Sequence, residues 1–158
     1  MSRAFVALGS NLKDPQAQVS SALTALNSLP DTQVVRPSSL YRTAPVGYDN
    51  QPDFINAVAE VQTSLTPIAL LRALLALENQ YGRERPFPNA PRVLDLDLLL
   101  YEDVQMQTTE LTLPHPRMHE RGFVMLPLAE IAPDLEVAGF GTASALAKAC
   151  GDQGVIRI

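Results

Sequence analysis

Residues 93–101 alternate between leucine and aspartate before continuing as an apolar run, and this pattern constrains the fold more than any other part of the chain. In Leu94-Asp95-Leu96-Asp97-Leu98 the period of two predicts a β-strand with Leu94, Leu96, Leu98 and Leu100 on the core face and both aspartates on the other. The two aspartate Cα atoms would lie about 7 Å apart, because a strand rises about 3.3 Å per residue. The chain must therefore build a sheet that packs one face of this strand and leaves the other face to two carboxylates.

The two aspartates have two interpretations. Carboxylates that converge from one strand repel each other unless cations lie between them, and two divalent ions about 3.5–4 Å apart are a common arrangement in phosphoryl transfer. The alternative is a polar strand face that is simply solvated. Aspartate is disfavoured inside strands, and Asp95 and Asp97 interrupt an apolar run, so the pattern favours metal binding.

Arginines gather immediately before this strand. Arg83, Arg85 and Arg92 stand there with Glu84 as the only acid between the first and the last of them. The whole chain, in contrast, carries 12 basic and 17 acidic side chains and a net charge of −5, which argues against a general binder of nucleic acid or anionic membranes. The arginines alone fit a solvated loop as well as a binding site. Beside two metal-binding aspartates, they favour a site for a polyphosphate.

Three further side chains attract attention by their type. Glu78 falls on or beside the apolar stripe of a helix predicted from Thr66 onward, where a charge is costly unless it has a partner. A ribose hydroxyl or an arginine would satisfy it, and the alternative is a side chain that extends into solvent. His115 lies between two prolines and is a candidate nucleotide contact, although one histidine makes no metal cluster. Cys150 is the only cysteine, which excludes an intrachain disulfide and favours a buried, inert thiol in a reducing cytosol.

The predicted elements follow one another as strand, helix, strand, strand, helix, strand. This order predicts a ferredoxin-like α+β domain (βαββαβ), with an antiparallel sheet, two helices on one face and the other face partly open to solvent or a ligand. We expect 158 residues to form a single domain, since a chain of this length buries roughly 70% of its unfolded surface. The expected pieces are a strand at 4–8 that enters a tight turn at 9–11, a helix from 15 to near 30, an edge strand or bulge at 32–41, a strand with one packed face at 54–63, a helix from 67, the strand at 93–101, short pieces at 104–113 and 123–128, and a helix at 142–149.

At this point Arg92-Val93-Leu94-Asp95-Leu96-Asp97 resembles the hallmark motif of the 6-hydroxymethyl-7,8-dihydropterin pyrophosphokinase family. The resemblance spans nearly the whole chain and implies a ferredoxin-like fold. It also implies transfer of pyrophosphate from ATP to the pterin hydroxymethyl group, with release of AMP, in tetrahydrofolate biosynthesis with two Mg²⁺ ions. Further motifs that carry it are Gly9-Ser10-Asn11-Leu12, Tyr41-Arg42-Thr43, Gln51-Pro52-Asp53-Phe54-Ile55-Asn56, Gly82-Arg83-Glu84-Arg85, Leu113-Pro114-His115 and Arg121-Gly122-Phe123.

The resemblance also implies roles for individual residues. Asp95 and Asp97 match the ligands of both magnesium ions, and Arg83 and Arg92 match contacts to the transferred phosphates. Phe54 and Phe123 would sandwich a flat bicycle while the amide of Asn56 pairs with its polar edge. Positions that match ATP contacts are Glu78, Arg85, Leu98, Thr112, His115 and Arg121. Positions that match the pterin pocket are Thr43, Ala44, Val46, Phe54, Asn56 and Phe123.

The chain departs from many relatives at two places. It has Pro88-Asn89-Ala90 where many have Arg-Trp-Gly, and Pro116 where a tyrosine follows the histidine. We expect the two loops at 43–52 and 82–91 to roof a substrate cleft, and we assign the segment after Leu135 to packing. We also expect a cytoplasmic monomer that binds small molecules and neither nucleic acid nor membrane.

Alternatives to this function remain at the level of the sequence. They are another metal-dependent phosphotransferase, a non-catalytic nucleotide sensor and an RNA-recognition module. The RNA module would need paired aromatic motifs and a basic sheet face. The sequence contains neither of these features.

Overall fold

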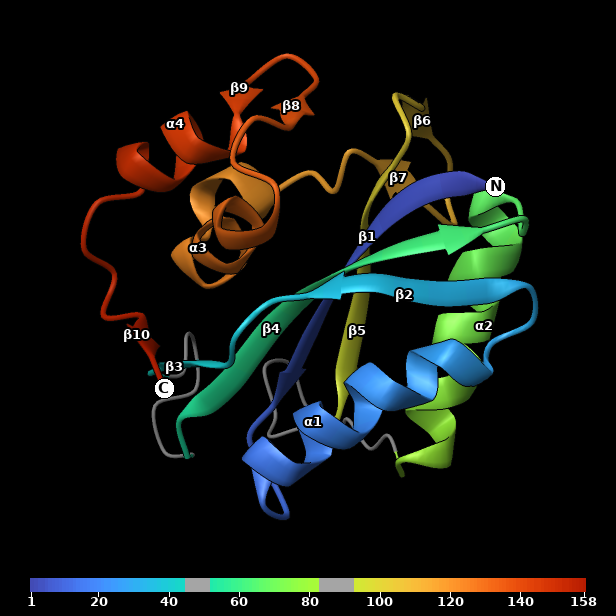
Figure 1. Ribbon diagram of the computed structural model, residues 1–158, viewed down its shortest axis with the longest axis horizontal. Coiled ribbons are helices and arrows are strands. Elements are labelled where there is room, and N and C mark those ends of the chain that lie inside the picture. Colours follow the sequence, from blue (N-terminus) through green and yellow to red (C-terminus); the bar gives the residue numbers. More distant parts are fainter. Residues whose placement is uncertain (45–51, 83–92) are drawn as a thin grey trace.

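The structure is a computed structural model that describes residues 1–44, 52–82 and 93–158, and its centre is an antiparallel sheet (Figure 1). The strands lie in the order β10-β3-β4-β1-β5, and β2 pairs with β4 as well. The predicted βαββαβ order with an antiparallel sheet is therefore confirmed. The strands are β1 (Ser2–Ser10), β2 (Thr32–Pro37), β3 (Tyr41–Thr43), β4 (Phe54–Thr63), β5 (Asp95–Tyr101) and β10 (Ile156–Arg157).

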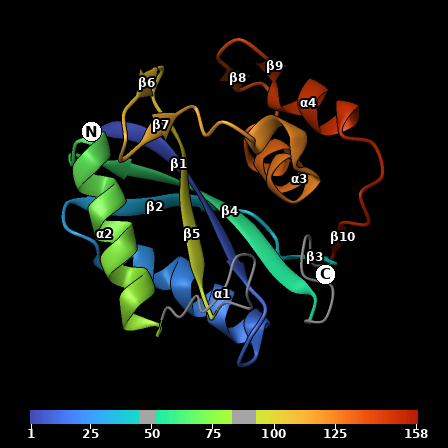
Figure 2. The same cartoon turned by 180° about the vertical axis from the view of Figure 1, so that it is seen from behind.

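The helices α1 (Pro15–Ala25) and α2 (Pro67–Gln80) lie on one face of the sheet in both views (Figures 1 and 2). Each helix begins with a proline after a capping side chain. Asp14 accepts a hydrogen bond from the backbone N–H of Ala17 at 3.5 Å, and Thr66 accepts one from Ala69 at 3.2 Å. A 3₁₀ turn, η1 (Leu26–Ser28), extends α1 to nearly the predicted end.

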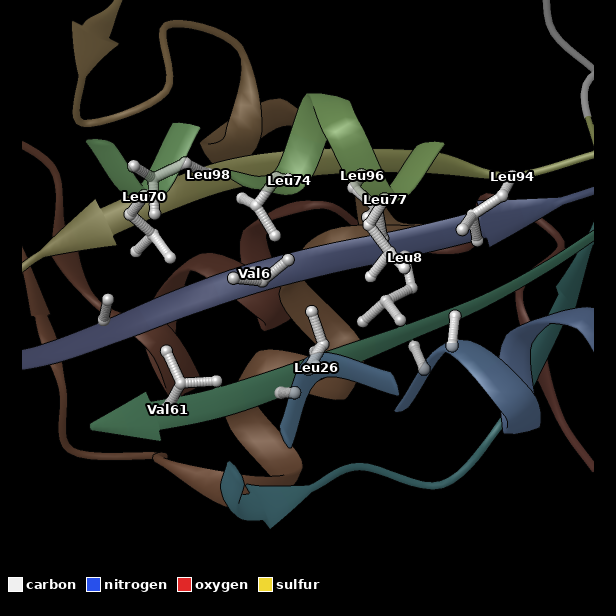
Figure 3. Close-up of a cluster of buried hydrophobic side chains, with 14 of the residues drawn as sticks. Val6, Leu8, Leu26, Val61, Leu70, Leu74, Leu77, Leu94, Leu96 and Leu98 are labelled. Atoms are coloured by element: carbon white, nitrogen blue, oxygen red, sulfur yellow. The ribbon is translucent and has the colours of Figure 1, made fainter. Parts of the chain in front are cut away.

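Leucines fill the space between these helices and the sheet. Leu70, Leu74 and Leu77 of α2 face the leucines of the Leu-Asp repeat, as Figure 3 shows. Leu94, Leu96 and Leu98 are at most 3% exposed, which confirms this part of the predicted leucine face. Each such leucine stabilises the fold by about 1.5–3 kcal/mol relative to an exposed position. The prediction is wrong for Leu100, which packs in a second cluster on the other face because the pairing of β5 with β1 shifts register between Phe5 and Val6.

The opposite face of the sheet is covered at one end. The helices α3 (Gly122–Ile131) and α4 (Ala143–Ala149) pack there over a second cluster that includes Phe5, Val58 and Leu99. The prediction of one packed face for residues 54–63 is therefore wrong, because Val58 extends from the supposedly open face and is fully buried. The segment at 123–128, expected as a short piece, is part of α3 and has Pro127 inside the helix.

The remaining elements are short. β6 (Met106–Gln107) pairs with β7 (Thr112–Leu113), β8 (Glu136–Val137) pairs with β9 (Gly141–Thr142), and η2 (Met118–Glu120) precedes α3. The pairing of β2 with β4 shifts register between Val34 and Arg36, so the irregularity expected near Pro37 is confirmed. None of the described helices is long and apolar enough to cross a membrane.

Candidate active site

A cavity of about 370 Å³ lies over the part of the sheet where both aspartates of β5 are found. Its floor comes from β1, β3, β4 and β5, and its wall comes from η2, the start of α3 and the chain after α4. Of the predicted site residues, the cavity brings together Thr43, Ala44, Phe54, Asn56, Asp95, Asp97, Arg121 and Phe123.

Asp95 and Asp97 are half-buried and line the cavity from β5. Their partners across β1 are Gly9 and Ala7, so small residues stand beside both carboxylates and leave room above the sheet. Among residues 1–44, 52–82 and 93–158, no cluster of three or more Asp, Glu, His or Cys side chains is arranged to hold a metal ion. Two carboxylates fit Mg²⁺ nevertheless, because this ion is commonly held by one or two carboxylates together with water and substrate phosphates.

Glu78 is buried between α2 and β5. Its side chain is 1% exposed, and its Oε2 accepts a hydrogen bond from the backbone N–H of Leu96 at 2.5 Å. The alternative of a side chain that extends into solvent is therefore wrong. This bond reaches the residue between Asp95 and Asp97, so Glu78 helps to hold the strand that presents them. Its contact with ATP stays a prediction.

Asn56 lines the cavity together with Phe54 and Phe123, and its side-chain amide is buried. Asn56 is 5% exposed, and its Nδ2 has no hydrogen-bond partner within the described residues. A buried donor without a partner costs about 1–3 kcal/mol, which a ligand with a suitable acceptor would recover. Phe54 and Phe123 line the same cavity, as the sandwich expected for a flat ring requires.

Gly9 makes room for this amide. It pairs with Asn56 across β1 and β4, and a Cβ at this position would lie 3.2 Å from the Asn56 Oδ1. The prediction of a turn at residues 9–11 is wrong, because β1 continues through Ser10.

Asn11 is fully buried, and its amide donates to the carbonyl of Pro52 at 3.1 Å, two residues before β4 begins.

Positive charge comes from the segment before α3. Arg117 and Arg121 line the cavity, and the guanidinium carbon of Arg121 lies 5.6 Å from the centroid of the Phe123 ring. Burial lowers the pKa of His115, and the charges of Arg121 and Arg117 lower it further, against the opposing effect of Asp95. The backbone N–H of Arg117 donates to Nδ1 of His115 at 3.4 Å, so the neutral ring carries its proton on Nε2.

Several predicted residues lie elsewhere. Leu98 is 2% exposed in the core beside α2, so only its main chain is available to a ligand. Thr112 is half-buried on β7, where it pairs with Gln107. Outside the described residues lie Val46, Arg83, Arg85 and Arg92, the substitution at Pro88-Asn89-Ala90, and most of the two loops expected to roof the cleft.

The cavity also contains residues that the sequence analysis did not assign to it. Arg117 and Glu120 stand in a short segment already marked by His115 and Arg121, and proximity to those motif residues was the available signal. Gln153 carried no signal, because it reaches the cavity only through the return of the chain after α4. Gln153 belongs to the segment after Leu135, which the sequence analysis assigned to packing, and its functional role stays a proposal.

The fold and the site together define a class: a ferredoxin-like enzyme domain in which paired carboxylates and arginines adjoin an aromatic pocket, an arrangement suited to phosphoryl transfer. A family model described as 7,8-dihydro-6-hydroxymethylpterin-pyrophosphokinase (HPPK) matches residues 5–133. The chain belongs to this family, which confirms its predicted role as a pyrophosphokinase that acts on the hydroxymethyl pterin in folate biosynthesis.

Individual relatives agree with the family. The 2-amino-4-hydroxy-6-hydroxymethyldihydropteridine pyrophosphokinase of Haemophilus influenzae is 43% identical over 158 residues, 100% of this chain and 99% of that protein. The protein of the same name from Pseudomonas aeruginosa is 43% identical over 156 residues, 99% of this chain and 96% of that protein.

A solved structure supports the fold. It is titled "Crystal Structure Analysis of the HPPK-DHPS in complex with substrates" and superposes with a TM-score of 0.76 at 13% identity. The match covers 94% of this chain and 43% of that one, so the present chain spans less than half the length of that structure.

Proposed function

We propose that this chain performs Mg²⁺-dependent transfer of pyrophosphate in the cavity described above, with Asp95 and Asp97 as ligands of two magnesium ions. The observation that carries the proposal is the presence, in one cavity, of two adjacent carboxylates and of a buried amide that has no partner among the described residues. The first feature suits a metal-bound triphosphate and the second suits the polar edge of a pterin.

The pterin would lie between Phe54 and Phe123, over Asn56. Stacking between aromatic rings is worth about 0.5–1.5 kcal/mol beyond the burial of their area. The Nδ2 of Asn56 would donate to the ring edge, and Thr43 and Ala44 would close the pocket from the end of β3. Val46 is proposed for the same pocket on the basis of the sequence motif alone.

The triphosphate would extend from the aspartates toward Arg121, and Arg117 would add a second guanidinium from the same segment. Guanidinium groups bind phosphate oxygens through paired donors and remain charged at every physiological pH. Arg83 and Arg92 are proposed to bind the transferred phosphates, on the basis of the sequence motifs alone. Further contacts to ATP are proposed for Glu78, Arg85, the main chain of Leu98, Thr112 and His115.

In the proposed reaction the hydroxymethyl oxygen forms a bond to the β-phosphorus of ATP. The bond between that phosphorus and the oxygen bridging to the α-phosphate breaks, and AMP leaves with the electron pair while the hydroxyl proton passes to solvent. Asp95 and Asp97 would hold magnesium, which would neutralise part of the phosphate charge. The protein contributes alignment of the hydroxyl with the phosphorus and arginine donors for the developing charge, which are the dominant effects in phosphoryl transfer.

The test is to incubate the protein with MgATP and 6-hydroxymethyl-7,8-dihydropterin and to separate the nucleotides by chromatography. We expect one AMP for each pterin diphosphate formed. Formation of ADP would instead indicate a phosphotransferase of another kind, and ATP binding without any product would indicate a sensor.

Asp97→Asn tests the metal assignment. We expect turnover to fall at least a thousandfold, because one of two carboxylate ligands is lost from a site on which charge neutralisation depends. Asp103→Asn is the control, since Asp103 is exposed in the turn after β5 and does not line the cavity. Turnover by Asp97→Asn at the rate of the control would exclude Asp97 as a metal ligand.

We also propose that the chain acts as a monomer in the cytoplasm. The single cysteine supports a reducing compartment.

A further inference from the structure

The last residues of the chain return to the sheet after α4. We call residues 150–158 the C-terminal strap. Its strand β10 pairs with β3 through Ile156 opposite Arg42 and Arg157 opposite Tyr41, and the N–H of Ile158 donates to the carbonyl of Leu40 at 3.0 Å. Figures 1 and 2 both show the C-terminus beside β3.

The start of α3 depends on this strap. The residue before the helix, Arg121, provides no side-chain cap. The first N–H of the helix, that of Gly122, donates instead to Oε1 of Gln153 at 2.9 Å. The Nε2 of Gln153 donates to the carbonyl of Glu120 at 3.0 Å and to that of Cys150 at 3.2 Å. The side-chain amide of Gln153 therefore hydrogen-bonds to the main chain on both sides of Arg121.

The approach is close because position 122 is glycine. A Cβ there would lie 3.2 Å from Oε1 of Gln153. Arg121 and Phe123 flank this glycine, and both line the cavity together with Gln153. The direction in which the arginine and the aromatic ring point is thus tied to a side chain 31 residues away in sequence.

The other end of the strap pairs with β3, a strand of the cavity floor. β10 extends the sheet next to β3, whose last residue, Thr43, lines the cavity. Arg157 lies 3.8 Å from Glu130 of α3, and Glu130 accepts a hydrogen bond from the hydroxyl of Tyr41 at 2.7 Å. The strap therefore joins β3 and α3, and both of these elements contribute residues to the cavity.

We propose that Gln153 is a positioning residue for the pterin pocket, which sets the orientation of Phe123 and Arg121 through the main chain of residues 120–122. The inference rests on the proposed placement of the pterin between Phe54 and Phe123. Gln153 acts through its neighbours, so its loss weakens pterin binding more than it slows the chemical step.

The test compares Gln153→Met with the wild-type protein. Methionine has a similar length and no amide, so it removes the three hydrogen bonds and keeps the bulk of the side chain. We expect KM for the pterin to rise about tenfold and kcat to fall less than threefold, with faster hydrogen exchange at the Gly122 amide measured by NMR. Gln33→Met is the matched control, since Gln33 is exposed on β2 and does not line the cavity.

Gln153→Glu distinguishes the hydrogen bond that Gln153 accepts from Gly122 from the two that it donates. The carboxylate still accepts from Gly122 but has no N–H for the carbonyls of Glu120 and Cys150. We expect its Gly122 exchange rate and its pterin KM to rise less than in Gln153→Met but not to stay at the wild-type values, because the carboxylate oxygen in place of Nε2 is repelled by the two carbonyl oxygens. If Gln153→Met lowers the midpoint of thermal unfolding markedly, the pterin KM of Gln153→Glu is used to test the inference in its place.

A pterin KM within twofold of wild type in Gln153→Met, with faster Gly122 exchange, would overturn the inference. An equal loss in Gln153→Glu and Gln153→Met would overturn the role of the Gly122 bond. Absence of AMP formation by the wild-type protein would instead refute the proposed function, so the two failures are distinguishable.

Discussion

Single residues decide the chemistry of this cavity, and Asn56 with Gly9 shows how closely two of them are matched. The amide of Asn56 is buried with an unpaired Nδ2 within the described part of the chain, and Gly9 is the residue opposite it on β1. The sequence motif named Asn56 as a pterin contact. It did not connect Gly9 with it, because the register that pairs them is a property of the folded sheet.

Gly9→Ala tests this match. The added Cβ would lie 3.2 Å from the Asn56 Oδ1, which is closer than most real Cβ contacts, so the amide must shift. We expect the Kd for the pterin, measured by fluorescence titration, to rise about tenfold, equivalent to about 1.4 kcal/mol. Ser2→Ala at the other end of β1 is the control. An unchanged Kd in Gly9→Ala would show that the Asn56 amide does not depend on this space.

At the scale of elements, the sheet edge and α3 are joined by one carboxylate. Glu130 of α3 accepts hydrogen bonds from the Tyr41 hydroxyl and from the N–H and hydroxyl of Ser39, and Arg157 of β10 lies nearby. Burial alone would raise its pKa, but these hydrogen bonds and the charge of Arg157 hold the pKa of Glu130 below its ordinary value. Burial raises the pKa of Tyr41, and the hydrogen bond to Glu130 and the charge of that carboxylate raise it further, against the opposing effect of Arg157.

Glu130→Gln should change how stability depends on pH. A carboxyl whose pKa is lower in the folded state stabilises it above the ordinary value of about 4.5, and this contribution disappears as pH falls through the folded pKa. We therefore expect the wild-type protein to be more stable than Glu130→Gln at pH 7 and the difference to shrink below pH 4.5. Urea unfolding at several pH values measures this difference in the free energy of unfolding. Glu136→Gln is the control, since Glu136 is exposed on β8. A difference that stays constant down to pH 3 would contradict this account.

At the scale of the whole molecule, the two faces of the sheet have separate tasks. One face packs against α1 and α2 through the leucine cluster. The other is covered by α3 and α4 at one end and is hollowed into the cavity at the other. The aspartates therefore stand on a strand whose opposite face is packed against α2, and this packing holds the strand rigidly.

MgATP should stabilise the whole fold by binding to this cavity. A ligand at 100 times its Kd adds about 2.7 kcal/mol to the free energy of unfolding. We expect the midpoint of thermal unfolding to rise by several degrees with MgATP and to fall back when EDTA removes the metal. Asp97→Asn should show less than half of the wild-type shift. A full shift in the presence of EDTA would mean that ATP binds without the metal.

The sequence by itself determined the strand that carries Asp95 and Asp97, the order of the core elements and the family. These depend on local periodicity and on contiguous motifs, which can be read without knowing what packs against them. Only the tertiary structure decided that Val58 is buried under α3, that Glu78 bonds to Leu96, and that Gln153 reaches the start of α3. Each of these contacts joins residues far apart in the chain, and a contact of that kind exists only once the packing of the elements has brought its two partners together.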